Sequence, residues 1–435
     1  MKKGNFFIKW LQDVFAPKML KVTNNVWILS IKDSIMQALP LVFLGSVFAV
    51  LTIPGDLWKI SWWPNFWAPF SWTFGSISLF VAFLIPFNLM EKKNRRKNRF
   101  VGGIASVVLF LMAINPQFMS DLSNSLTTGE LPFYRLTGIG GFGAGGMLVA
   151  IICGLVAGFV VNLFSKFSFF KEESVIPNFV RSWFDSMLPL GIVTILGWVL
   201  TDASFLNLNL YQILVSVFMP LQNFALSPFG FVLILFIYCF IYSMGISSWI
   251  LVPVVSPILL NAAQINGQLV EAGTATFANL NLLTDATIYS AYLWIGGIAC
   301  TMPLVIMMVL QAKSKRLKAL GKACIVPSIF NINEPVVFGA IAWNPILMVP
   351  MWLQGIILPI LVYLFTKVIP FAPVPAILFN MWYTPFPIST WIVTQSIQGI
   401  ILVAAVFVVS WLIWSPFFKV YDKQVCVEES GSEQA

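Results

Sequence analysis

Glu334 is the side chain in this sequence best suited to chemistry. It stands in Asn331-Ile332-Asn333-Glu334-Pro335, between two apolar runs, in a chain with 17 acidic residues and no histidine. A carboxylate at membrane depth costs roughly 2 to 4 kcal/mol on insertion scales, so polar groups must meet it there. It can accept two hydroxyl hydrogens at once, and a partly desolvated carboxylate is suited to take a proton from a hydroxyl. The sequence therefore predicts Glu334 as a ligand-binding group and a candidate catalytic base.

The prolines around this carboxylate predict a break in the helix. Pro327 and Pro335 each remove a backbone donor, and Pro335 disfavours the α conformation at Glu334. Asn331 and Asn333 are suited to satisfy the freed backbone groups. Broken backbone persists at membrane depth only when buried in protein or lining a wet cavity, so we expect a re-entrant hairpin with Glu334 at its tip. The alternative is a kinked helix in which Glu334 bonds to a neighbouring helix.

The composition indicates an all-α polytopic membrane protein. Apolar residues make up 59% of the chain, charged residues 10%, and the mean hydropathy is +0.87. The net charge of +8 is gathered in short clusters between apolar runs, as in cytoplasmic loops, which excludes nucleic-acid binding. Five scattered cysteines without a C-x-x-C pair, together with the absence of histidine and of a P-loop motif, predict no metal site, no ATP hydrolysis and no cofactor.

The 435 residues have room for about ten transmembrane helices and two re-entrant hairpins. We expect five parts: a cytoplasmic amphipathic segment (1–30), an N-terminal transmembrane half (31–205), an interfacial connecting helix (206–228), a C-terminal transmembrane half with the hairpins (229–416) and a cytoplasmic tail (417–435). A second broken segment is expected at Trp249–Leu260, where Pro253 and Pro257 interrupt an apolar run. Gly154-x-x-x-Gly158 predicts close helix packing rather than a phosphate cradle.

The positive charges predict that both termini are cytoplasmic. Of the 25 Lys and Arg residues, Lys59, Arg135 and Lys367 alone fall in loops expected outside, and Lys32 begins the first span. The same count places the basic run from Lys313 to Lys322 inside, so the Glu334 segment would enter from the cytoplasm. A soluble transport partner would dock on that side.

Several stretches resemble one family of membrane proteins. The basic run Lys313–Lys322 and the following Phe330–Gly339 resemble the membrane IIC subunits of the bacterial phosphotransferase system (PTS), in the lactose/cellobiose (diacetylchitobiose) family. Shorter matches lie in the same order and spacing at Ile31–Ser34, at Trp294–Gly297 and at Trp382–Pro385. The resemblance covers essentially the whole chain.

The resemblance implies a homodimeric, multi-pass sugar permease of the bacterial cytoplasmic membrane, with the N-terminal half at the dimer contact and the sugar in the C-terminal half. It presents the sugar to a cytoplasmic IIB protein, which is itself served by IIA and transfers the phosphate from a phosphocysteine; the permease has no catalytic domain of its own. The resemblance places in the sugar site Glu334, Asn333, Ser247, Gly296, Gly297 and Trp382, with Trp382 stacking on a ring. The basic side chains at which IIB would dock are Lys313, Lys315, Arg316 and Lys318.

One stretch departs from the family pattern and leaves two other functions open. The family usually has Gly-Ile-His-Gly where this chain has Gly245-Ile246-Ser247-Ser248. Ser247 can hydrogen bond a hydroxyl but does not take a proton at neutral pH. The first alternative is therefore a sugar-binding sensor without phosphotransfer. The second is an ion-coupled transporter that uses Glu334, which the scarcity of other intramembrane charges disfavours.

Overall fold

The structure, a computed structural model, describes residues 13, 14, 18, 21, 24–58, 60–120, 134–137, 139–170 and 177–432. Most of the expected amphipathic segment at 1–30 and the last three residues of the expected tail lie outside this part of the chain. The described residues are nearly all helical, and they divide into two compact units. The N-terminal unit comprises Lys21–Leu44 and Ala68–Pro220, and the C-terminal unit comprises Gly45–Trp67 and the chain from Leu221 on.

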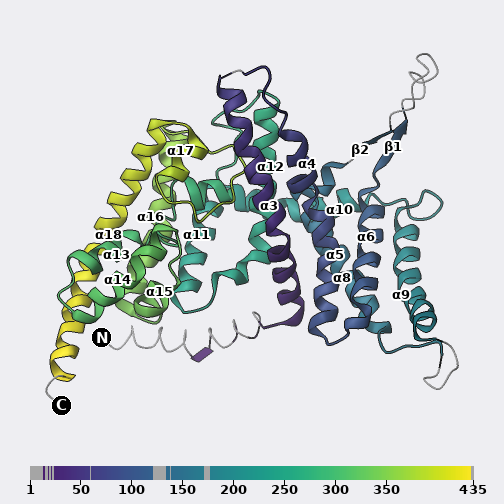
Figure 1. The fold of residues 1–435 in the computed structure, drawn as a ribbon, viewed down its shortest axis with the longest axis horizontal. Helices are drawn as coiled ribbons and strands as arrows, with labels where there is room; N and C mark the ends of the chain where they lie inside the picture. The colour runs from purple at the N-terminus through teal and green to yellow at the C-terminus, as the bar shows by residue number, and fades with distance from the viewer. Residues whose placement is uncertain are drawn as a thin grey trace. The chain divides into compact units, whose positions relative to one another are not determined.

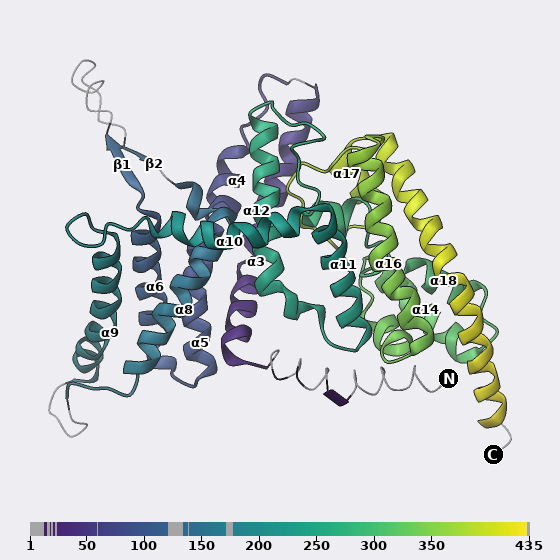
Figure 2. The ribbon, with the colours of Figure 1, turned by 180° about the vertical axis from the view of Figure 1, so that it is seen from behind.

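Three helices, α5, α6 and α8, form the centre of the N-terminal unit and lie next to one another in Figures 1 and 2. Its elements are α3 (Val26–Trp58, shared with the other unit), α4 (Trp67–Thr73), η2 (Phe74–Ser76), α5 (Ile77–Lys92), η3 (Arg96–Asn98), α6 (Arg99–Ile114), β1 (Gln117–Ser120), β2 (Tyr134–Thr137), η4 (Ile139–Phe142), η5 (Ala144–Gly146), α8 (Met147–Phe164), α9 (Asn178–Thr201) and the first part of α10 (Leu210–Leu226).

Glycines let α8 approach α5 closely. A Cβ atom on Gly154 would lie 2.8 Å from Cβ of Ile85, and one on Gly158 would lie 2.7 Å from Cδ2 of Leu89. Both separations are too short for a side chain, so the predicted packing role of these glycines is confirmed, and their partner is α5 of the same chain. The antiparallel pair β1–β2 was not predicted; in it Gln117 lies opposite Thr137 and Ser120 lies opposite Tyr134.

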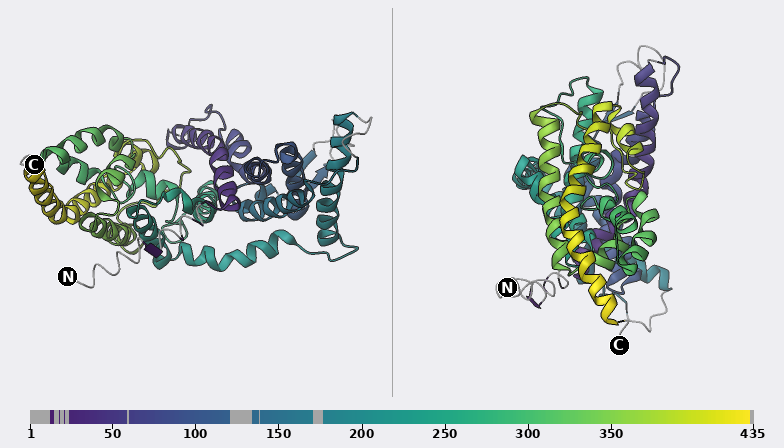
Figure 3. Two further views of the ribbon diagram at one scale, coloured as in Figure 1. Left: turned by 90° about the horizontal axis from the view of Figure 1, so that it is seen from below. Right: turned by 90° about the vertical axis from the view of Figure 1, so that its left-hand side faces the viewer.

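The C-terminal unit holds the largest buried core and all the predicted sugar-site residues. Its elements are α11 (Pro228–Ser243), η6 (Ser248–Leu251), α12 (Val252–Glu271), the π-helix η7 (Ala286–Ala291), α13 (Met302–Leu310), α14 (Lys315–Ile329), α15 (Glu334–Val336), the π-helix η8 (Val337–Ile341), α16 (Pro345–Tyr363), the π-helix η9 (Leu364–Val368), α17 (Ile388–Thr394) and α18 (Ile397–Ser432). The helix α16 packs against both α11 and α18, and Figure 3 shows the long, yellow α18 beside the green helices of this unit.

The expected position of the second break is wrong, because Pro253 and Pro257 do not interrupt the helix within Trp249–Leu260. The helix α12 runs unbroken through Pro257, and Pro253 stands in its first turn, where a missing N–H costs nothing. The chain turns earlier, at Gly245, whose φ of +69° suits glycine. The predicted helix within 206–228 is found as α10, which bends by 82° into α11.

Seven helices of the described residues are long and apolar enough to cross a membrane, or eight if α10 and α11 form one broken span. The prediction of an all-α polytopic membrane protein is therefore confirmed. The number of ten spans and the re-entrant hairpins remain predictions.

Candidate functional site

The chain breaks immediately before Glu334. The helix α14 ends at Ile329, and Asn331 adopts a left-handed conformation with a φ of +60°. The N–H of Ile332 turns back to the carbonyl of Pro327 (3.0 Å), and a new helical turn begins at Glu334. The predicted break is thus present, but Glu334 itself is helical rather than extended, because the reversal is completed at Asn331–Asn333 and Pro335 stands in a first turn that needs no N–H.

The amide of Asn331 joins three segments of the chain. Its Oδ1 accepts a hydrogen bond from the N–H of Gly296 (3.0 Å), and its Nδ2 donates to the carbonyls of Trp382 (2.7 Å) and Thr384 (3.0 Å). The predicted residues Gly296 and Trp382 therefore lie beside the Glu334 segment, although they are far from it in the sequence.

Asn333 makes a second, fully buried junction. Its Nδ2 donates to the carbonyl of Ile298 (2.8 Å) and to Oγ1 of Thr301 (3.1 Å), and this hydroxyl in turn donates to the carbonyl of Gly296 (2.7 Å). A Cβ atom on Gly297 would collide with the Asn333 side chain, and Gly297 has a φ of +104°. Gly296 has a φ of +77°, so both glycines suit the left-handed turn, and Gly297 also leaves room for the Asn333 side chain.

Glu334 faces Tyr242 of α11. The carboxylate is exposed, whereas Tyr242 is only 2% exposed. The tyrosine hydroxyl lies beside the carboxylate without a well-aligned hydrogen bond, and no other group of the described residues satisfies it. Buried hydroxyls are rarely left unpaired, so this pair of groups is suited to bind the hydroxyls of a ligand. The sequence prediction missed Tyr242, whose signal was a polar group on a helix that is otherwise almost entirely apolar.

Ser247 lies on the exposed turn between α11 and η6. This turn packs near the far end of η8 from Glu334: the N–H of Trp343 donates to the carbonyl of Ser243 (3.0 Å), and a Cβ on Gly245 would lie 3.4 Å from Nε1 of Trp343. Within the described residues, no hydrogen bond joins the Ser247 side chain to Glu334.

A second acidic group, Asp285, was also missed by the sequence prediction. Its Oδ2 accepts a hydrogen bond from Nδ2 of Asn380 (3.1 Å), a residue on the same loop as Trp382. Asp285 and Tyr289 are half-buried, while the other residues between Leu282 and Cys300 are all buried. Asp285, which precedes η7, and Tyr289 within it are therefore less buried than their neighbours.

The predicted docking residues surround the start of α14. The side chains of Lys313, Lys315, Arg316 and Lys318 are exposed. Their backbone is held by α18: Asp422 accepts the N–H groups of Lys313 (3.0 and 3.1 Å) and Ser314 (3.0 Å), and Glu429 accepts those of Lys315 (3.1 Å) and Arg316 (2.8 Å). These carboxylates cap the helix that leads to Glu334.

The described residues contain no group of three or more His, Cys, Asp or Glu side chains that could hold a metal ion. The five cysteines are free thiols, and four of them are buried. The side chains gathered near Glu334 carry carboxylate, amide, hydroxyl and aromatic groups, which suit a ligand rich in hydroxyls.

Comparison with known proteins identifies the family of the chain. The family model described as "Phosphotransferase system, EIIC" matches residues 32–355. The cellobiose-specific EIIC component of Geobacillus stearothermophilus is 28% identical, and the alignment covers 98% of this chain and 96% of that protein. The lactose-specific EIICB component of Staphylococcus haemolyticus is 26% identical, over 99% of this chain and 73% of that protein.

A solved structure shares the fold. The transporter ChbC, the IIC component from the N,N'-diacetylchitobiose-specific phosphotransferase system, matches with a TM-score of 0.81 and 27% identity, over 97% of this chain and 99% of its own. The family model spans most of the chain, from the first long helix into α16. The chain therefore belongs to the EIIC family of the phosphotransferase system.

Proposed function

We propose that the protein is the sugar-specific permease of a phosphotransferase system, which carries a disaccharide or oligosaccharide of the cellobiose and lactose type across the cytoplasmic membrane. The observation that carries this proposal is the exposed carboxylate of Glu334 beside the unpaired hydroxyl of Tyr242, held in place by the buried amides of Asn331 and Asn333. The relatives named for cellobiose and lactose support the substrate class.

Each group has a defined part in the proposed reaction. Glu334 accepts the hydrogen of a sugar hydroxyl and takes its proton as the sugar oxygen attacks the phosphorus of a IIB phosphocysteine. The phosphorus–sulfur bond breaks, and the cysteine thiolate of IIB leaves. Tyr242 donates to a neighbouring sugar oxygen, Ser247 offers a further hydroxyl, and Trp382 supplies an apolar face for the CH side of a ring.

The assembly around this site is part of the proposal. A IIB protein docks at the exposed basic residues that begin α14, and IIA supplies the phosphate to IIB. Relatives that are named EIICB support such a partnership, because their names join the C and B components. The N-terminal half (31–205) makes a homodimer contact, about ten spans and two re-entrant hairpins form the membrane domain, and both termini are cytoplasmic.

Sugar binding by purified protein tests the proposal. We expect calorimetric binding of cellobiose, lactose or N,N'-diacetylchitobiose to the wild type, and sugar phosphate when phosphorylated IIB is added. Glu334→Gln keeps the size of the side chain and removes the charge, which should weaken binding by about 1.5 to 3 kcal/mol, or ten- to a hundredfold. Glu271→Gln is the matched control, since Glu271 is an exposed carboxylate at the end of α12.

The same measurements distinguish the alternatives. Binding without product across a panel of phosphorylated IIB proteins would identify a sensor. Uptake that depends on an ion gradient and needs no IIB would identify an ion-coupled transporter. If Glu334→Gln binds the sugar as strongly as the wild type does, the Glu334 carboxylate does not bind the sugar and its role is structural.

A further inference from the structure

We propose that Gln354 of α16 and Ser410 of α18 are positioning residues for sugar binding. They hold the backbone of residues 296–301, named here the glycine turn, and this turn supports Asn333 immediately before Glu334. The inference rests on the proposed function, because it names residues that support the same site from the helices packed around it.

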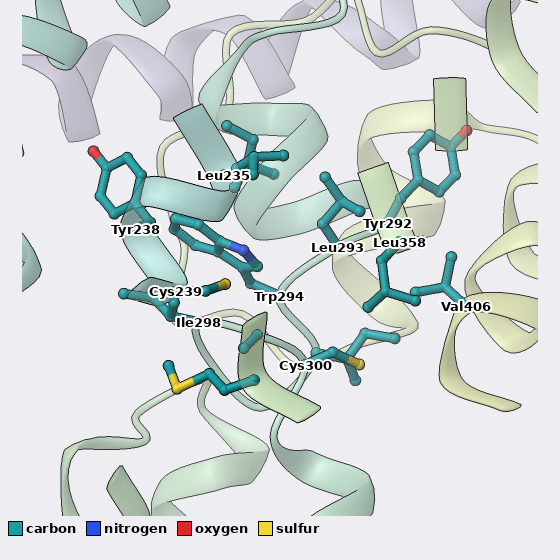
Figure 4. Close-up of a cluster of buried hydrophobic side chains, with 14 of the residues drawn as sticks. Leu235, Tyr238, Cys239, Tyr292, Leu293, Trp294, Ile298, Cys300, Leu358 and Val406 are labelled. Carbon is teal, nitrogen blue, oxygen red and sulfur yellow. The ribbon is translucent and has the colours of Figure 1, made fainter. Parts of the chain in front are cut away.

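The glycine turn has an unusual backbone. Besides its two glycines, Ala299 and Cys300 also adopt left-handed conformations, with φ values of +68° and +50°. A Cβ atom makes this conformation unfavourable, so it persists only where the surrounding structure holds it. Both residues are buried, and Figure 4 shows Cys300 in a buried cluster with Leu293 and Leu358. Apolar packing has little directionality, so hydrogen bonds must fix the direction of the turn.

Two side chains of α18 donate to the carbonyl of Cys300. The oxygen lies 3.0 Å from Oγ of Ser410 and 3.2 Å from Nε1 of Trp414. The two donors are four residues apart in one helix, so they lie on the same face, and both side chains are fully buried. A carbonyl oxygen has two lone pairs, so these two bonds use both and fix its orientation.

Gln354 holds Ser410 from the neighbouring helix α16. Its Nε2 donates to the backbone carbonyl of Ser410 (3.1 Å) and to Oγ of the same residue (2.9 Å). Because Oγ accepts from Gln354, its own hydrogen is directed to the carbonyl of Cys300. Oε1 of Gln354 is buried and has no hydrogen-bond partner among the described residues. An apolar side chain of similar length would avoid the cost of that unused acceptor, so the donor side of the amide is the part that the fold uses.

The glycine turn passes this constraint to Asn333. Nδ2 of Asn333 donates to the carbonyl of Ile298 (2.8 Å) and to Oγ1 of Thr301 (3.1 Å), which lie on either side of Cys300. Asn333 is the cap residue of α15, whose first residue is Glu334. A change in the direction of the Cys300 carbonyl would therefore move the acceptors that hold the start of the helical turn with the carboxylate.

Sugar binding by purified full-length variants tests the inference. The probes are cellobiose, lactose and N,N'-diacetylchitobiose, each titrated in a calorimeter. We expect Ser410→Ala to weaken the sugar that the wild type binds by about three- to tenfold, as the loss of one buried hydrogen bond allows. Gln354→Met keeps the length of the side chain and leaves the Ser410 hydroxyl in place, so its effect should be smaller and in the same direction.

Thr366→Val is the matched control. It also removes a buried hydroxyl of the C-terminal unit, but this hydroxyl bonds to the carbonyl of Val362, four residues earlier in the chain. Binding should change less than twofold in this variant. A loss in Thr366→Val as large as that in Ser410→Ala would show that any missing buried hydroxyl weakens binding, and it would overturn the positioning role.

Hydrogen–deuterium exchange of the sugar-free variants separates positioning from general loosening. Two N–H groups report on the supported segments: that of Gly296, which donates to Asn331, and that of Val337, which donates to the carbonyl of Asn333 (2.9 Å). We expect Ser410→Ala to speed exchange in peptides that contain these groups and to leave peptides of α12 unchanged.

Unchanged sugar binding in Ser410→Ala, or faster exchange that is equal in α12 and in the glycine turn, would overturn the inference while leaving the permease function intact. If the wild type binds none of the three sugars, the proposed function itself fails, and the exchange measurement still decides whether the two side chains hold the Glu334 segment. If Ser410→Ala does not fold, Gln354→Met decides by the same two measurements.

Discussion

The side chain of Asn331 ties the chain break before Glu334 to two other segments of the protein. One amide accepts from the N–H of Gly296 and donates to two carbonyls of the Trp382–Thr384 loop. Asn is also among the few residues that tolerate the left-handed conformation found here. The position of Glu334 therefore depends on a neighbour that need not touch the sugar.

Replacement of Asn331 tests this dependence. Asn331→Ala leaves the buried N–H of Gly296 without its acceptor, so the free energy of unfolding should fall. We expect the fall to exceed that of a control variant by roughly 1 to 3 kcal/mol, where the control loses only an Asn in the left-handed conformation. Asn94→Ala is that control, because Asn94 is exposed and has a similar φ of 57°. Thermal unfolding in detergent and sugar binding are the measurements. Equal losses in the two variants, with sugar binding retained, would show that Asn331 does not support the site.

Among the single residues, the sequence identified those whose chain neighbours already mark them as unusual. Glu334 stood out because a carboxylate between apolar runs needs polar partners, and its role in binding remains a prediction. Asn331 and Asn333 were expected to satisfy backbone groups freed by the prolines, whereas their amides bind groups of other segments of the chain. Tyr242 and Asp285 were not predicted as site residues, because their meaning depends on which helix packs beside them. The interaction between Tyr242 and Glu334 exists only once α11 lies against η8.

Among the elements, the helix α18 binds the backbone at the start of α14. A helix of 36 residues is about 54 Å long, well beyond the roughly 30 Å of a bilayer core, so part of α18 must lie outside the hydrocarbon. Asp422 and Glu429 are seven residues apart on one face of this helix, and they accept the backbone N–H groups from Lys313 to Arg316. Because α14 leads directly to the break at Asn331, this contact fixes the approach to the site.

Neutralising Asp422 should loosen that contact. Asp422→Asn loses charge-assisted hydrogen bonds, so we expect faster hydrogen–deuterium exchange across Lys313–Phe330 and weaker sugar binding. Glu428→Gln is the matched control, since Glu428 is exposed on the same helix and its side chain accepts from Gln424 of α18 itself. Exchange that is unchanged in Asp422→Asn would show that the Asp422 contact does not hold the start of α14.

The two proline-containing segments show why breaks are hard to predict. Pro327 and Pro257 both lie inside helices, and α12 continues past Pro257. What reverses the chain before Glu334 is Asn331 in a left-handed conformation, with tertiary partners for its amide. Proline removes a donor, but whether the helix ends depends on contacts that lie far away in the sequence.

For the whole molecule, the orientation in the membrane is the main prediction, and cysteine labelling in sealed vesicles tests it. Lys97 and Lys318 are exposed and lie in the two basic clusters expected inside, so cysteines at both positions should react from the cytoplasmic side alone. Cys426 is replaced by serine beforehand, because it is the one natural cysteine that is not buried. Ser204→Cys, in an exposed turn after α9 that is expected outside, is the opposite-side control.

Labelling of Lys97→Cys and Lys318→Cys from one side also constrains the number of crossings, which must then be even between them. Five candidate spans of the described residues lie in this interval: α6, α8, α9, the bent pair α10–α11, and α12. Five crossings would place the two lysines on opposite sides. If all five spans cross, the segment between Glu271 and Lys318 must therefore cross the membrane as well. The longest α-helix of this segment, α13, has nine residues, whereas a helical span needs about 20. Such a crossing would therefore include non-helical backbone around Gly296, and that backbone would have to be buried in protein. Reaction from opposite sides would instead contradict the charge-based orientation and place the two basic clusters in different compartments.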